Sequence, residues 1–94
     1  MSTMALTFYL PSPPDEIDNV LHDIWQEGGI KQMIYVKRLS QRGNNYIRGL
    51  LISDSEVELP PLFESRYLSD DLVEEKYDNL KQEILEQENG VEYF

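Results

Sequence analysis

Apolar and polar residues alternate in short stretches of this chain and recur with helical spacing in two longer ones. Strict alternation places every second side chain on one face of a strand, and spacing of three and four residues places apolar side chains on one side of a helix. We expect strands at residues 4–10, 30–39, 46–53 and 56–59. In the first of them, Leu6, Phe8 and Leu10 share one face.

The first helix is predicted between the strands at 4–10 and 30–39. Ser12, followed by two prolines, is a typical helix start, and Gly28 with Gly29 is a typical stop. The apolar positions between them follow the spacing of an amphipathic helix: Ile17, Val20, Leu21, Ile24 and Trp25. Trp25 is the largest of these side chains, and we expect it to be the main anchor of the core.

The second helix is predicted from Ser69 or Asp70 to about residue 88, where Asn89 and Gly90 favour a stop. Its inner stripe is Val73, Tyr77, Leu80 and Ile84. Two apolar segments flank it, at residues 59–63 and 91–94. We expect the first to cover an open end of the core, and the alternative is a proline-containing docking segment. The second either packs on the sheet or is a docking peptide.

These elements predict an α+β fold with the order β-α-β-β-β-α. The three strands after the first helix are expected to form an antiparallel meander. A four-stranded, mainly antiparallel sheet with both helices packed on one face would close a single core. Ninety-four residues are enough for one small domain, which we place at residues 1–94.

The composition limits where the protein works. The chain has no cysteine, which excludes disulfides and thiolate chemistry and fits a reducing cytoplasm. No stretch approaches the ~20 apolar residues that span a bilayer, and the N-terminus has no signal-peptide pattern. We therefore expect a cytoplasmic protein without membrane partners.

The charge is sorted along the chain. Residues 1–29 carry five acids and no Lys or Arg, residues 31–48 carry five basic residues and no acid, and residues 50–94 carry thirteen acids and three basic residues, which sums to the net charge of −10. A field of this kind repels nucleic acid at long range and speeds encounter with a basic protein surface. The charge distribution therefore predicts a binding protein.

The second helix is the predicted binding element. Its acids include like-charge pairs four residues apart, Asp71 with Glu75 and Glu74 with Asp78, and each such pair destabilises a helix by about 0.2–0.5 kcal/mol. We predict that Asp71, Glu74, Glu75 and Asp78 bind Lys or Arg residues of a basic partner protein, as in a small regulator. One alternative is an inhibitor that mimics the charge of nucleic acid. A merely solvated helix face is the other.

A second candidate patch lies around the loop between the strands at 30–39 and 46–53. It contains four basic residues, Lys37, Arg38, Arg42 and Arg48, with tyrosines nearby. Such a hairpin could bind nucleic acid, although the field of the whole molecule opposes it. The alternatives are that the acidic helices neutralise the hairpin, that its charges prevent edge-to-edge aggregation, or that it meets the acidic helix of a second copy in a homodimer.

Signals for catalysis are weak, and we predict a non-catalytic protein with no cofactor and no metal. The sole histidine, His22, follows Asp18 by one helical turn. A metal site needs further ligands than this pair. There is no nucleophile elbow, no phosphate-binding glycine loop and no calcium-loop pattern.

Overall fold

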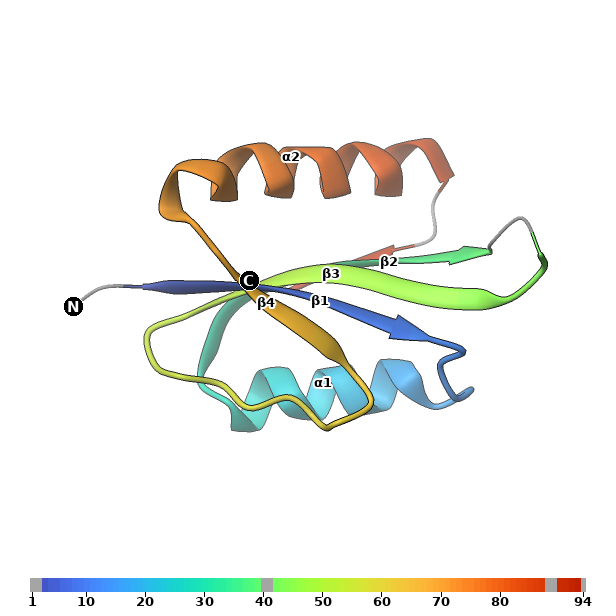
Figure 1. The fold of residues 1–94 in the computed structure, drawn as a ribbon, viewed down its shortest axis with the longest axis horizontal. Coiled ribbons are helices and arrows are strands. Elements are labelled where there is room, and N and C mark those ends of the chain that lie inside the picture. The colour runs from blue at the N-terminus through green and yellow to red at the C-terminus, as the bar shows by residue number, and fades with distance from the viewer. Residues whose placement is uncertain (1–2, 40–41, 88–89, 94) are drawn as a thin grey trace.

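A computed structural model describes residues 3–39, 42–87 and 90–93 (Figure 1). Its elements in chain order are β1 (Met4–Pro11), α1 (Ile17–Glu27), β2 (Ile30–Leu39), β3 (Asn45–Ser53), β4 (Glu64–Leu68), α2 (Asp70–Gln87) and β5 (Gly90–Tyr93). The α+β class predicted from the sequence is confirmed. Neither helix, as far as the structure describes it, has both the length and the apolar character needed to cross a membrane.

The five strands form one sheet in the order β4-β1-β3-β2-β5, and every neighbouring pair is antiparallel. Strands β1 and β2 therefore run in the same direction with β3 between them, and α1 connects them. The sheet has five strands rather than the predicted four. The predicted three-stranded meander is wrong beyond its first hairpin, the antiparallel pair β2-β3, which is present. Strand β1 lies inside the sheet, and the strand that follows the hairpin returns to the far edge beside β1.

The two helices cover opposite faces of the sheet, which gives three layers (Figure 1). The prediction that both helices pack on one face is therefore wrong. The reason is visible in the central strands: Met33, Ile34, Tyr35 and Val36 are consecutive and all buried. Side chains of a strand alternate between faces, so a run like this needs cover on both sides.

Each face of the sheet has its own core. On the α1 side, strand residues such as Leu6, Phe8, Met33 and Tyr35 pack with Leu21 of the helix. On the α2 side, the smaller core consists of Ala5, Ile34, Val36, Leu50 and Leu80, with Leu68, Val73, Tyr77 and Ile84 packed against it. The predicted inner stripe of the second helix is thus confirmed, but it faces a different core from the first helix.

The predicted strand at 56–59 is also wrong. This stretch is part of an irregular connector between β3 and β4 that runs along the α1 side of the sheet (Figure 1). Val57 and Leu59 are partly buried against the core there, and Phe63 is buried. The connector therefore covers the core beside α1, which is only eleven residues long. Edge strand β4 was not predicted because most of its side chains are exposed and give no apolar alternation.

The boundaries of α1 follow from backbone conformation. Ser12, predicted as its cap, adopts a left-handed conformation (φ 48°) and donates its backbone N–H to the Asn45 carbonyl at 2.8 Å. The helix begins at Ile17 without a side-chain cap. At its other end Gly29 has a φ of 66°, which confirms the predicted glycine stop.

Trp25 is not the main core anchor, because the largest fully buried side chains are Tyr35 and Phe8. Its indole is partly buried and stacks on Tyr93 of β5, with ring centroids 5.0 Å apart. The C-terminal segment therefore packs back on the protein as a fifth strand. Phe94 lies outside the described residues.

Candidate functional site

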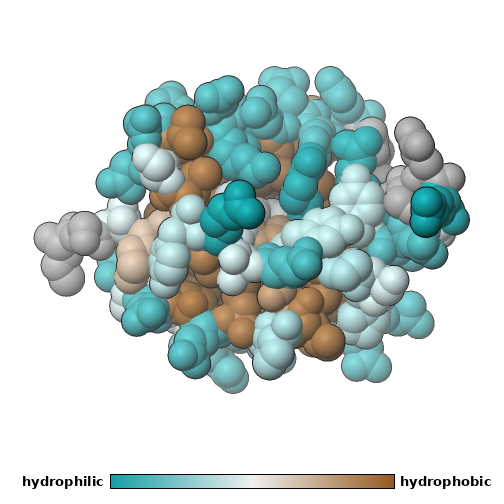
Figure 2. Space-filling model, viewed as in Figure 1, coloured by the Kyte–Doolittle hydropathy of each residue, from teal (hydrophilic) through white to brown (hydrophobic). Residues whose placement is uncertain are grey.

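The outward side of α2 carries the four acids predicted to bind a partner. Asp71, Glu74, Glu75 and Asp78 are all exposed. None of them takes part in an ion pair within the described ranges 3–39, 42–87 and 90–93. Asp71 accepts a hydrogen bond from the hydroxyl of Ser69, just before the helix. In the view of Figure 2, hydrophilic residues dominate the side of the molecule that α2 covers.

Among the described residues, Glu83 of α2, unlike the four outward acids, pairs with basic residues of the sheet. It is half-buried, accepts a hydrogen bond from Arg48 of β3, and lies 3.6 Å from Arg38 of β2. These contacts hold the C-terminal half of α2 against β2 and β3. They also distinguish Glu83, which has a structural role, from the four outward acids about one to three turns earlier, which are exposed.

An open hollow of about 420 Å³ lies between the outward acids and the sheet. Its polar rim includes Asp70, Glu74 and Asp78 from α2, and its apolar lining includes Val73, Tyr77 and Ile52. Such a hollow can take a lysine or arginine side chain, because its aliphatic stem fits the apolar lining while its charged end meets the carboxylates.

Tyr77, which lines this hollow, is held in place by β5. Its hydroxyl donates to the carboxylate of Glu92. Partial burial, followed by the hydrogen bond and negative charge of Glu92, raises the pKa of the Tyr77 phenol. Tyr77 is therefore neutral at physiological pH and forms a fixed wall of the hollow. Neither β5 nor this contact was predicted, since residues 91–93 are too few to show a strand pattern.

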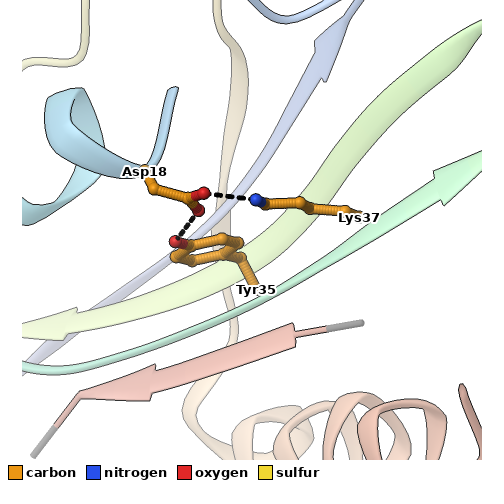
Figure 3. A network of polar contacts seen from close by, with 3 residues as sticks. All are labelled: Asp18, Tyr35 and Lys37. Carbon is orange, nitrogen blue, oxygen red and sulfur yellow. Dashed lines mark hydrogen bonds and ion pairs between the residues drawn. The ribbon is translucent and has the colours of Figure 1, made fainter. Parts of the chain in front are cut away.

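The α1 side has a polar network of three residues, Asp18, Tyr35 and Lys37 (Figure 3). The Tyr35 hydroxyl donates to one carboxylate oxygen of Asp18 at 2.6 Å, and the Lys37 ammonium donates to the other. Tyr35 and Lys37 are two residues apart on β2 and so share a face. That spacing could be seen in the sequence, but the sequence did not show which of the two helices Tyr35 and Lys37 face.

The pKa values in this network are shifted for physical reasons. Partial desolvation by itself would raise the pKa of Asp18, but hydrogen bonds from Lys37 and Tyr35 and the charge of Lys37 outweigh it, so the pKa is lowered. Burial, and then the hydrogen bond and charge of Asp18, raise the pKa of Tyr35. The carboxylate is ionised and the phenol protonated at neutral pH, which suits a structural clamp between α1 and β2.

The four basic residues of the hairpin do not form one patch. Lys37 is turned to the α1 side and pairs with Asp18, while Arg38 and Arg48 are turned to the α2 side and pair with Glu83. Arg42 is exposed in the loop and has no ion pair in the part of the chain that the structure describes. Acids of both helices thus pair with three of the four basic residues of the hairpin, which agrees in part with the alternative that the helices neutralise it.

The pair of Asp18 and His22 does not form. Asp18 points to β2, whereas the His22 ring lies 5.8 Å from that of Tyr93 and its Nδ1 is 4.0 Å from a carboxylate oxygen of Asp23. No group of three or more potential metal-binding His, Asp or Glu side chains occurs among the described residues.

Comparison with family models, with curated proteins and with solved structures finds no match for this chain. Function is therefore inferred from the side chains themselves.

Proposed function

We propose that this protein is a non-catalytic interaction module that binds a basic surface of another protein through the outward side of α2. Asp71, Glu74, Glu75 and Asp78 would provide charge-assisted hydrogen bonds to lysine and arginine residues. The observation that carries the proposal is a difference among the acids of α2. Glu83 is neutralised by Arg38 and Arg48, while the four outward acids remain exposed and unpaired within the described residues.

The energetics of the helix support this assignment. The pairs Asp71/Glu75 and Glu74/Asp78 repel each other across one turn, and Lys76 and Lys81 have no ion pair with them among the residues that the structure describes. If this helix face served stability alone, we would expect a Lys or Arg four residues after Asp71 or Glu74 in place of the second acid. The hollow beside Glu74 and Asp78 adds a place where one cationic side chain of the partner could enter.

The test compares two double charge reversals. Glu74→Lys with Glu75→Lys changes the proposed surface. Glu56→Lys with Glu58→Lys makes the same change of net charge on the exposed acids of the connector. In pull-downs from the native host, we expect proteins retained by the parent to be retained by the connector variant and lost with the α2 variant, with unchanged circular dichroism for both. Equal retention by both variants would contradict the proposal.

The same experiment separates a basic partner from a nucleic-acid mimic. If the captured protein binds DNA or RNA, its nucleic acid is added in competition. Displacement of this chain would support mimicry, and a ternary complex would support an independent docking site on the partner.

A further inference from the structure

Strand β4 is an exposed edge of the sheet. It pairs with β1 on one side and has no strand beside its other side in the described part of the chain. An edge strand leaves backbone N–H and C=O groups free to pair with another strand. Figure 2, which looks onto this edge, shows hydrophobic residues at the surface near the connector and near the start of α2.

The exposed apolar side chains gather around this edge. Of the four exposed large apolar residues among those described, three lie within β4 or within a few residues of its ends: Leu62 (75 %), Tyr67 (56 %) and Leu72 (45 %). Leu62 lies just before the strand and Tyr67 within it. Leu72 lies one helical turn before Lys76, which lines a groove together with Glu64 and Arg66 of β4. Apolar residues that cluster at an open strand edge are typical of an interface.

Strand β4 carries two charged side chains. Glu64 and Arg66 share the face of the sheet that α2 covers, opposite Tyr9 and Thr7 of β1. Neither has an ion pair within the described ranges. The groove above them contains Arg48 and Lys76 as well. A carboxylate brought to this groove by another strand would meet several cations.

We propose that two copies of this chain associate through antiparallel pairing of their β4 strands about a two-fold axis at Ser65. This register places Glu64 of each copy opposite Arg66 of the other, so that the interface contains two symmetric cross-strand ion pairs. On the opposite face it brings Tyr67 of each copy beside Phe63 of the other. The alternative register centred on Arg66 places two arginines directly opposite each other, which is unfavourable.

This interface uses an edge of the molecule that the proposed partner surface on α2 does not include. It also differs from a homodimer formed by the basic hairpin and the acidic helix. The two proposals can therefore fail separately.

A charge swap tests the pairing. Sedimentation equilibrium of the full chain is measured up to about 1 mM, the weak limit of specific association. We expect the parent to dimerise, and Arg66→Glu or Glu64→Arg to weaken dimerisation at least about tenfold by placing like charges opposite each other. The double swap should restore it, because each ion pair reforms with reversed sign. Lys81→Glu makes the same charge change as Arg66→Glu but on α2, and it should dimerise like the parent.

A cysteine trap tests the register. Because the chain has no cysteine, Ser65→Cys introduces a single thiol. Directly opposite residues of an antiparallel pair have Cα atoms about 4.5–5.5 Å apart, within disulfide reach. Under mild oxidation we expect Ser65→Cys to form cross-linked dimers much faster than Ser55→Cys, an exposed serine of the connector, or Arg66→Cys. A parent that stays monomeric, a double swap that does not restore association, or faster cross-linking of either control overturns the proposal.

Discussion

At the scale of single residues, the position of α1 depends on one buried hydroxyl group that needs a hydrogen-bond partner. Tyr35 is fully buried on the central strand β2, and a buried phenol needs a hydrogen-bond partner. Asp18 of α1 supplies it, and Lys37 balances the charge of Asp18. The network therefore fixes how α1 lies on the sheet.

Replacing Asp18 with Asn tests this clamp. We expect the variant to be less stable than the parent by about 1 kcal/mol at neutral pH, since the pair is partly exposed. The pKa of Asp18 is lowered from its ordinary value of 3.8. Its contribution is therefore present above that pH and lost as the pH falls through the lowered pKa. The urea midpoints of the parent and of the Asp18→Asn variant should therefore differ at neutral pH and converge as the pH is lowered.

Asp23→Asn is the matched control for this experiment, because Asp23 is exposed on the same helix. It should leave the midpoint nearly unchanged at every pH. A parent and Asp18 variant that differ equally at neutral and strongly acid pH would show that the charge of Asp18 is not the cause.

At the scale of elements, β3 is the centre of the sheet and depends on a glycine. A Cβ at Gly49 would lie 2.4 Å from the ring of Phe8 and 2.7 Å from the carbonyl oxygen of Ile34. The Phe8 side chain, from the neighbouring strand β1, thus lies directly over the backbone of β3.

Gly49→Ala should therefore destabilise the protein by about 1–3 kcal/mol through overpacking. Gly43→Ala would not be a clean control, because Gly43 has a φ of 83°. Asn79→Ala on the exposed side of α2 is the comparison we choose. Equal urea midpoints for the Gly49 variant and the parent would contradict the close approach of Phe8.

Strand β5 is held by the stack of Tyr93 on Trp25. Since Trp25 is the sole tryptophan, its fluorescence reports on this contact. Tyr93→Ala should shift the emission to longer wavelength by exposing the indole, and should lower stability by at least about 1 kcal/mol. Tyr67→Ala, at the opposite edge of the sheet, should leave the emission unchanged. An unshifted emission for the Tyr93 variant would separate β5 from Trp25.

The same elements show how far sequence patterns reach. Both helices, the strands at β1, β2 and β3, and the inner stripe of α2 follow from local periodicity, and the structure confirms them. Edge strands β4 and β5 were missed, because exposed or very short strands have little apolar alternation. Their places depend on pairing with β1 and β2, which no local pattern encodes.

At the scale of the whole molecule, the charges are arranged by face. The basic central strands lie between two acidic helices. Each helix has one carboxylate that pairs with them, Asp18 from α1 and Glu83 from α2. Over the whole chain, eighteen acids exceed eight basic residues and give the net charge of −10, so the surplus carboxylates repel each other through solvent. This self-repulsion opposes the compact state and is screened by salt.

Stability in urea should therefore rise as salt is added. Glu75→Gln should raise stability by about 0.2–0.5 kcal/mol at low ionic strength, because it removes the repulsion with Asp71 one turn away. The difference between variant and parent should disappear at high salt. Glu83→Gln should have the opposite sign, since it leaves Arg48 without its charged partner. Stability that falls with salt in the parent would mean that internal ion pairs outweigh the repulsion.

The sequence by itself determined the local features of this protein: which segments are helical or extended, which residues of α2 point inward, and how charge is sorted along the chain. These depend on neighbours a few residues apart. Only the tertiary structure decided that the helices cover opposite faces, that β4 and β5 form the edges, and that Glu83 is neutralised while Glu74 and Glu75 are not. Those outcomes depend on contacts between distant parts of the chain, where several arrangements satisfy the same local pattern.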